Sequence, residues 1–420
     1  MLDRTVAPQA YPIAGISFPV YHVHPFAQGM EGVLVFDHAH PVVSVEILLK
    51  SGRWYENVPG VSYYAIKMLQ EGTATKSAEQ VAFGFESLGS FLELNTGLDH
   101  CVVKLYSLKR TFEKSLALLQ EILFSPVFPE KEFGLMRVQR SEQIKAHLSN
   151  NSQLATLLFN KKLFGENHPY GTILTPDRVM ELELGQVTDY YRHQLFYEPQ
   201  LLLTGHVEEK EIELVNNMLC IPMTLSGGQM GSTGHARKEA EPVMASRQST
   251  QASVRLGSRT IGKNHPDFHN LSISNSLLGG FFGSRLMKNI REEKGYTYGI
   301  YSSLIQTLHE NYWLVSTEMT KDNVKLGIEE IKKEIALLAA VAPTNEEMDI
   351  LKNYLKGKLM GSMDTVFGKA QLVKSLAIHK LPENYFDTYF ESIERLTPDQ
   401  IPALIDTYLQ ADPQVLIELS

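Results

Sequence analysis

The segment Leu277–Ser302, LLGGFFGSRLMKNIREEKGYTYGIYS, carries the most specific local pattern of the chain. Together with the residues from His269 onward, it predicts a long helix that ends at Gly295, because glycine is favoured just past a helix C-terminus. The residues that follow, Thr297–Gln306 and Asn311–Met319, predict two paired strands. A helix, a glycine stop and a strand pair give this region an α+β character.

The order of elements in this region echoes an order found earlier in the chain. Two Thr-Pro-Asp helix starts, at Thr175 and Thr397, lie about 220 residues apart. Predicted helices that begin near Thr111 and Lys321 are separated by a similar distance. This spacing favours an internal duplication of one α+β unit, and the alternative is coincidence, because Thr-Pro-Asp is a common helix start.

The predicted fold class is therefore α+β, with two duplicated domains in a clam-like arrangement. Each domain is expected to be an antiparallel or mixed sheet packed with helices. The N-terminal domain spans residues 1–224 and the C-terminal domain spans residues 250–420. Residues 225–249, rich in Gly, Ser and charge, predict a linker between them.

Composition narrows the classes of function. The chain has 420 residues, and its net charge of -9 argues against a nucleic-acid partner. Two cysteines are too few for a disulfide framework and favour a reducing compartment. No apolar run reaches the length of about 18 residues that a membrane helix needs, and no signal peptide is recognisable. A cytoplasmic location is expected, or a periplasmic one if a signal has been removed.

The stretch Ser62–Thr73, SYYAIKMLQEGT, predicts a second informative helix, which ends at Gly72. This stretch and the segment Leu277–Ser302 together resemble the pitrilysin-like (insulinase-type, inverzincin) zinc metallopeptidase family, and the resemblance covers essentially the whole chain. In that family the early helix carries H-x-x-E-H, in which two histidines bind zinc and the glutamate acts as general base. A glutamate on a later helix completes the protein ligands.

The resemblance assigns these four positions to residues that cannot do this chemistry. The first histidine becomes Tyr63, the glutamate becomes Ile66 and the second histidine becomes Lys67, while the later ligand falls at Gln143, with Glu142 beside it. Isoleucine cannot take a proton, and a protonated lysine repels a cation. We expect no zinc and no other cofactor in this chain. On this interpretation Ser62–Glu71 is an ordinary structural helix.

Other metal or nucleophile sites have little support in the sequence. His22 with His24, and His38 with His40, have the i, i+2 spacing that places two rings on one face of a strand. No third ligand is suggested, so solvated surface pairs are the simpler interpretation. No G-x-S-x-G elbow and no phosphate loop is present.

The late segment keeps a second part of the family's pattern. The resemblance implies that Arg291, at the end of the predicted helix, and Tyr298, seven residues later, assist catalysis from the C-terminal domain. A tyrosine hydroxyl can donate a hydrogen bond to the oxyanion that forms at a scissile carbonyl. An arginine fork can hold substrate carbonyls or a carboxylate. Without the resemblance, a surface arginine at a helix end and a packing tyrosine would explain both residues.

The resemblance thus implies a chain that is inactive alone. We expect the non-zinc-binding subunit of a heteromeric pitrilysin-like metallopeptidase, which supplies Arg291 and Tyr298 while a homologous partner subunit supplies zinc. The substrate would be unfolded peptide, which the hairpin Phe91–Ser107 could bind by strand addition or, as an ordinary hairpin, not bind at all. The alternatives are a non-enzymatic scaffold or binding subunit and an enzyme with a relocated metal site. The isolated chain could also form a homodimer.

Overall fold

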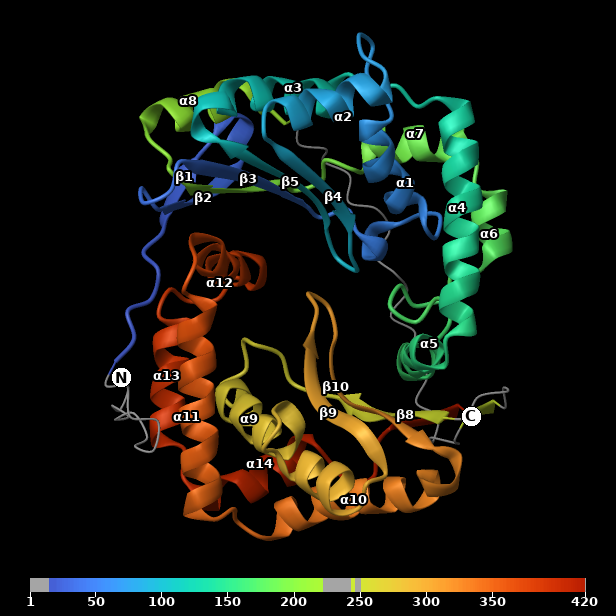
Figure 1. Cartoon of the computed structure of the whole chain (residues 1–420), viewed down its shortest axis with the longest axis vertical. Helices are drawn as coiled ribbons and strands as arrows, with labels where there is room; N and C mark the ends of the chain where they lie inside the picture. The colour runs from blue at the N-terminus through green and yellow to red at the C-terminus, as the bar shows by residue number, and fades with distance from the viewer. Residues whose placement is uncertain (1–14, 222–242, 246–250, 420) are drawn as a thin grey trace, which may run out of the picture.

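The computed structural model describes residues 15–221, 243–245 and 251–419, and it contains two β-sheets, each packed with helices (Figure 1). The two sheet-and-helix units lie one above the other in this view. The predicted α+β fold with two similar units is confirmed. None of the helices in the described ranges is long and apolar enough to cross a membrane.

The two sheets share one strand order. The N-terminal sheet is ordered β1-β2-β6-β3-β5-β4, and the C-terminal sheet is ordered β7-β11-β8-β10-β9. The pairs β2–β6 and β7–β11 are parallel, and the pairs of the remaining neighbours are antiparallel. From β2 onward the two orders therefore match strand for strand, which supports the duplication. The strands are β1 (His22–Pro25), β2 (Glu31–Phe36), β3 (Val42–Leu49), β4 (Phe91–Thr96), β5 (Cys101–Leu108), β6 (Gln200–Gly205), β7 (Val243–Ala245), β8 (Gln251–Arg259), β9 (Thr297–Gln306), β10 (Asn311–Thr320) and β11 (Val415–Leu419).

The helices of each half flank its sheet, with α2, α3 and α8 above the N-terminal sheet and α10 and α14 below the C-terminal sheet in Figure 1. Their apolar faces build one large core in each half. The helices are α1 (Val61–Lys67), α2 (Ala78–Ser87), α3 (Phe112–Phe124), α4 (Glu130–Ser149), α5 (Asn151–Phe164), α6 (Pro176–Glu181), α7 (Leu184–His193), α8 (Glu209–Met218), α9 (Phe268–Asn275), α10 (Val324–Ala340), α11 (Asn345–Ser362), α12 (Val366–His379), α13 (Tyr385–Arg395) and α14 (Ile401–Tyr408).

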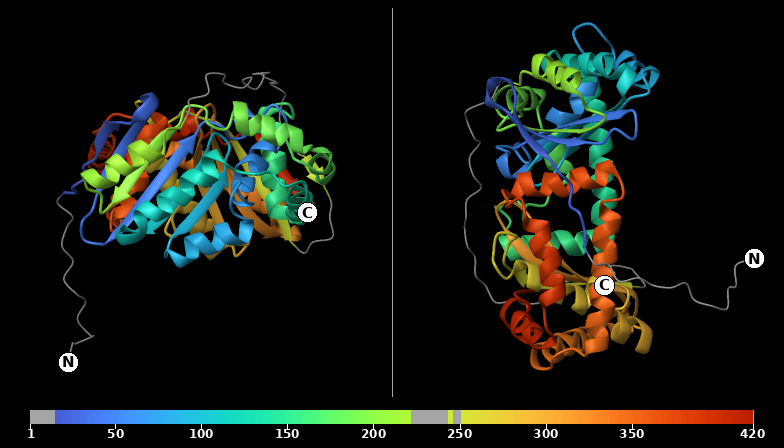
Figure 2. Two further views of the ribbon diagram at one scale, coloured as in Figure 1. Left: turned by 90° about the horizontal axis from the view of Figure 1, so that it is seen from above. Right: turned by 90° about the vertical axis from the view of Figure 1, so that its left-hand side faces the viewer.

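Two helices cross to the opposite unit. Helix α5 belongs to the N-terminal half by sequence but packs on β8 and β11 of the C-terminal sheet. Helix α12 makes the reciprocal contact with β2 and β6 of the N-terminal sheet, beneath which it lies in the side view of Figure 2. The long helices α4 and α11 lead to them along opposite sides of the molecule (Figure 1). The two halves are thus interlocked by exchanged helices, which the sequence did not indicate.

The two units also meet through the tips of two hairpins. The β4–β5 turn offers Asp99, whose Oδ2 accepts a hydrogen bond from the backbone N–H of Leu308 in the β9–β10 turn at 2.9 Å. Beside it, the ring of His309 stacks on Trp54 with ring centroids 3.9 Å apart. These contacts join residues more than 200 positions apart in sequence.

Most of the predicted linker lies outside the described residues, so the boundaries at 224 and 250 stay predictions. The exception is β7, which pairs with β11 as the last strand of the C-terminal sheet.

One predicted element is wrong in its extent. The helix expected over His269–Gly295 is broken, because α9 ends at Asn275 and two π-helical turns follow, η5 (Ser276–Gly280) and η6 (Met287–Glu293). The break coincides with Gly279, where an added Cβ would lie 2.7 Å from Ser302 on β9. The glycine therefore permits close packing of the helical segment on the strand, and that packing interrupts the helix. Gly295 does end the segment, with a left-handed φ of 65°.

Candidate functional site

Helix α1 carries three of the four positions that the resemblance assigns to zinc chemistry. It begins after Gly60, whose φ is 91°, and its first turn is capped by the carboxylate of Glu56. Oε2 of Glu56 accepts from the backbone N–H of Gly60 at 2.8 Å, and Oε1 accepts from the N–H and the hydroxyl of Ser62 at 3.0 and 2.5 Å. This cap satisfies backbone donors that an uncapped helix start leaves unpaired. The 3-10 turn η3 (Met68–Gln70) continues the helix.

The side chain at the general-base position belongs to the hydrophobic core. Ile66 is 0% exposed and packs in the same core cluster as Tyr64, Ala65 and Met68. Its position can therefore not deliver a group to a bound water. Burial of such a side chain stabilises the fold by roughly 1.5–3 kcal/mol.

The two ligand positions on α1 are half-buried and adjoin a positive charge. The Tyr63 ring lies 4.3 Å from the guanidinium carbon of Arg140 on α4, a cation–π contact. Burial lowers the pKa of the Lys67 ammonium, and the charge of Arg140 lowers that pKa further. Gln143, at the position of the later ligand, accepts a hydrogen bond from Nη1 of Arg140 at 3.2 Å.

The four positions do not fit a zinc ion. None of Tyr63, Ile66, Lys67 and Gln143 offers the imidazole, thiolate or carboxylate that zinc prefers. Glu142, beside Gln143, is well exposed and pairs with Lys145 at 2.6 Å. The site thus holds cationic groups where the family resemblance places a cation.

The histidine pairs give no metal site either. His22 and His24 do lie on one strand, β1, whereas His38 and His40 lie in the loop between β2 and β3. No group of three or more His, Cys, Asp or Glu side chains is placed to hold a metal within residues 15–221, 243–245 and 251–419.

Arg291 and Tyr298, by contrast, come together. They line one cavity of about 540 Å³ at the edge of the C-terminal sheet, here named the Arg291 cavity. Arg291 lies in η6, Gly295 turns the chain, and Tyr298 follows on β9, the last strand of its sheet. The other lining residues are Gln251, Glu292, Gly295, Tyr296, Thr297, Glu318 and Thr320.

Both side chains are available to a ligand. Tyr298 is 90% exposed, and its hydroxyl makes no hydrogen bond within the described ranges. The guanidinium of Arg291 lies over the ring of Phe282, 4.5 Å from its centroid, and Phe282 is itself 61% exposed. A phenol donor and a guanidinium at one open cavity can together bind a developing oxyanion and a peptide carbonyl.

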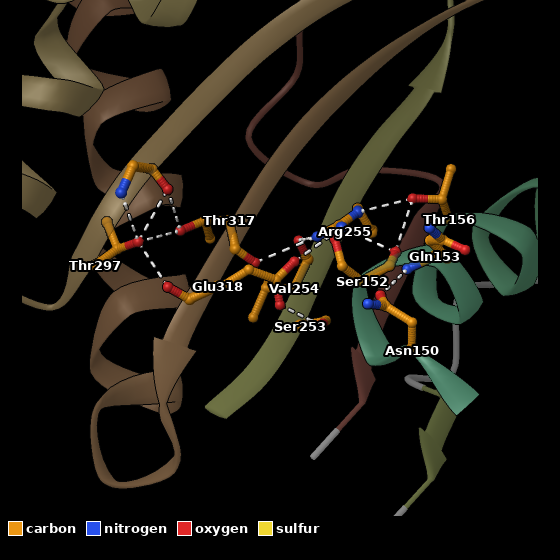
Figure 3. A network of polar contacts seen from close by, with 11 residues as sticks. Asn150, Ser152, Gln153, Thr156, Ser253, Val254, Arg255, Thr297, Thr317 and Glu318 are labelled. Carbon is orange, nitrogen blue, oxygen red and sulfur yellow. Dashed lines mark hydrogen bonds and ion pairs between the residues drawn. The ribbon is translucent and has the colours of Figure 1, made fainter. Parts of the chain in front are cut away.

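A buried arginine that the sequence did not single out holds one wall of the Arg291 cavity. Arg255 on β8 is 4% exposed, and its Nη2 pairs with Oε1 of Glu318 at 2.9 Å. The same guanidinium donates to Oγ of Ser152 at 2.6 Å and to Oγ1 of Thr156 at 3.1 Å, both on the exchanged helix α5 (Figure 3). A helix of the N-terminal half therefore helps to place a carboxylate at the cavity.

The remainder of this network lies next to Tyr298. Oγ1 of Thr297 donates to the carbonyl oxygen of Glu318 at 2.6 Å, and the hydroxyl of Thr317 donates to Thr297 at 2.9 Å (Figure 3). These bonds fix the strand that carries Tyr298 at a point where the β9–β10 register is irregular. One wall of the cavity is thus held by a hydrogen-bond network, whereas Tyr298 beside it is exposed.

The family follows from comparison with known proteins. Residues 33–177 match the model of the insulinase family of M16 peptidases, and residues 232–355 match the model described as the peptidase M16 inactive domain. The chain belongs to the M16 peptidase family. The two matched regions fall in the two sheet-bearing halves of this M16 chain.

Two relatives and one solved structure illustrate the similarity. This M16 chain is 23% identical to an uncharacterized zinc protease, YmxG, of Bacillus subtilis, over 78% of its own length and 80% of the relative's. It is 21% identical to the non-peptidase homolog YmxG of Helicobacter pylori, over 89% and 88% of the two chains. A crystal structure of a peptidase M16 inactive domain from Pseudomonas fluorescens superposes with a TM-score of 0.86 at 24% identity, covering 95% of this chain and 98% of that one.

Part of the site could have been found from the sequence. Arg140 precedes Gln143 by three residues on a predicted helix, so both lie on one helix face. Arg255 gave no such signal, because its partners on α5 lie about 100 positions away in the chain.

Proposed function

We propose that this chain is the non-zinc-binding subunit of a heteromeric M16 metallopeptidase and supplies Arg291 and Tyr298 to peptide hydrolysis. The observation that carries the proposal is that both side chains line one open cavity while Tyr298 is 90% exposed. An exposed tyrosine with no partner in the described residues contributes little to folding, which favours a role towards a ligand.

The roles of the two subunits follow from the groups that this chain lacks. The α1 region has no group that activates water, so this chain cannot by itself hydrolyse a peptide. A homologous partner with an intact H-x-x-E-H would supply zinc and the general base. Tyr298 would then donate to the oxyanion, and Arg291 would hold the peptide backbone or a carboxylate. A cytoplasmic location is part of this proposal.

The test is peptide hydrolysis by the paired subunits. The chain is co-expressed with an M16 chain that carries H-x-x-E-H, and kcat is measured for Tyr298→Phe and Arg291→Ala. Loss of one oxyanion donor should lower kcat roughly 100- to 1000-fold. Tyr301→Phe is the matched control, because Tyr301 lies on the same strand, is 54% exposed and does not line the Arg291 cavity.

The outcomes are distinct. Tyr298→Phe should leave the melting temperature unchanged, because it changes an exposed hydroxyl. Equal rates for Tyr298→Phe, Tyr301→Phe and the unaltered pair would show that the assigned role is wrong.

A scaffold or binding subunit is the second candidate, favoured by the similarity to a relative named as a non-peptidase homolog. On this alternative, substitutions in the Arg291 cavity have no effect. Substitutions in an interface with the partner would instead dissociate the complex, which gel filtration detects.

A further inference from the structure

A second cavity lies beside α1, at the position of the missing zinc motif. It has a volume of about 330 Å³ and is here named the Arg53 cavity. Its polar wall includes Arg53, Arg140 and Tyr63 as well as the carboxylate of Glu56, and its apolar wall includes Ile144 and Leu157. The cavity therefore suits a ligand that carries a charge at one end and an apolar group at the other.

The polar wall concentrates positive charge. Burial lowers the pKa of the Arg53 guanidinium, Glu56 raises it and Arg140 lowers it. Arg140 also lowers the pKa of the Lys67 ammonium. Arg140 thus lies within electrostatic range of two other cationic groups, Arg53 and Lys67, and this repulsion costs free energy that a bound anion would offset.

The chain provides little to compensate this charge. Within the described ranges, neither Arg53 nor Arg140 forms a salt bridge, and Nε of Arg140 is buried without a hydrogen-bond partner. One carboxylate of the cavity wall, Glu56, offsets part of the charge of Arg53 without a salt bridge, and it accepts three hydrogen bonds from the start of α1. The guanidinium groups therefore keep free donors, whose planar forks match a carboxylate.

The position of the cavity next to an edge strand indicates that its anionic ligand can be the end of a bound peptide. Thr96, the last residue of β4, and Gly97 line the Arg53 cavity. Strand β4 is the last strand of its sheet, so one of its edges is available to an added strand. A peptide that pairs with β4 can thus end in the cavity.

We propose that the Arg53 cavity binds the C-terminal carboxylate of an extended peptide whose last side chain is apolar, with Arg53 and Arg140 as the donors. The peptide backbone pairs with β4, and the apolar side chain contacts Ile144 and Leu157. The cationic groups beside α1 then bind the end of a peptide at the place where the family resemblance puts zinc. This inference does not rest on the role of Arg291 and Tyr298, because it concerns binding to this chain alone.

The experiment compares two peptides that differ in one group. Fluorescein-labelled Ser-Thr-Val-Thr-Val-Thr-Leu is titrated with the full chain, once with a free C-terminal carboxylate and once as the C-terminal amide, and fluorescence anisotropy gives Kd. The free carboxylate should bind about 10- to 100-fold more tightly, as expected for charge-assisted hydrogen bonds. A third peptide, amidated and with an internal glutamate, tests whether a side-chain carboxylate serves instead.

Variants assign the effect to the cavity. Arg140→Gln should abolish the preference for the free carboxylate. Lys145→Gln is the matched control, since it removes one positive charge from the same helix at an exposed residue that does not line the cavity. Equal binding of the carboxylate and amide peptides to the unaltered chain, absence of binding by both, or tighter binding of the glutamate peptide would each overturn the proposal.

Discussion

Helix α1 and the Arg291 cavity lie in two units that share one strand order, yet their marked residues are placed in opposite ways. Ile66 is 0% exposed in the core of the N-terminal half, whereas Tyr298 is 90% exposed at the edge of the C-terminal sheet. At the general-base position the apolar side chain of Ile66 takes part in core packing, and its burial stabilises the fold. An exposed phenol contributes little to stability, so folding does not explain why Tyr298 lies beside Arg291 at one cavity.

The largest effect is expected when the zinc motif is restored on α1, which tests whether the core position of Ile66 still tolerates a catalytic group. The triple variant Tyr63→His, Ile66→Glu, Lys67→His should be destabilised by about 5–7 kcal/mol at pH 7. Protonating the buried glutamate costs up to about 4 kcal/mol, and losing the burial of Ile66 costs roughly 1.5–3 kcal/mol more. Urea unfolding measures the loss, and elemental analysis measures zinc.

The single variant Tyr63→His is its control, because Tyr63 is only half-buried and loses a cation–π contact of about 0.5–1 kcal/mol. A stable triple variant with one zinc per chain would contradict the assignment of Ile66 to the core.

The second prediction tests whether the two units are independent. Arg255→Met should destabilise the protein by about 3 kcal/mol, because it leaves Glu318 without its cationic partner and Ser152 and Thr156 without a donor. It should also lower activity of the paired enzyme by moving Glu318 at the Arg291 cavity.

Arg395→Met provides a control on α13 of the same half. Its ion pair with Glu391 is exposed on both sides, so we expect a loss of about 1 kcal/mol or less. Equal losses for the two variants in urea unfolding would show that the contact between α5 and the C-terminal sheet does not depend on Arg255.

A smaller effect is expected where the hairpin tips of the two units meet. Burial lowers the pKa of His100 in the β4–β5 turn to about 4, although Asp99 raises it. Between pH 6.5 and 4 the unfolded chain binds a proton that the folded chain does not. Stability therefore falls as the pH drops through this window, by about 2 kcal/mol at pH 5. His100→Gln should remove this contribution, as measured by urea unfolding at pH 7, 6 and 5.

His24→Gln, on β1 and away from this contact, controls for the loss of one imidazole. An unchanged pH dependence in His100→Gln would show that His100 is already protonated, or solvated, in the folded protein.

The sequence by itself determined the class of fold, the family and the loss of zinc ligands. Local signals sufficed for these, since glycine stops, capping residues and strand periodicity act over a few residues. The stop at Gly295 and the paired strands over Thr297–Gln306 and Asn311–Met319 are examples that the structure reproduces. The placing of Arg291 and Tyr298 on either side of Gly295 and the emptied motif follow from such local patterns and the family resemblance, whereas the strand order of the sheets does not.

Only the tertiary structure decided how the halves interlock and what surrounds each site. The exchange of α5 and α12, the bonds of Arg255 to α5 and the charge shared by Arg53 and Arg140 join residues about 85 to 105 positions or more apart. The break at Gly279 likewise depends on β9, which comes later in the chain. No local pattern encodes these contacts, because they arise when separate apolar faces pack together and bring distant polar groups into one space.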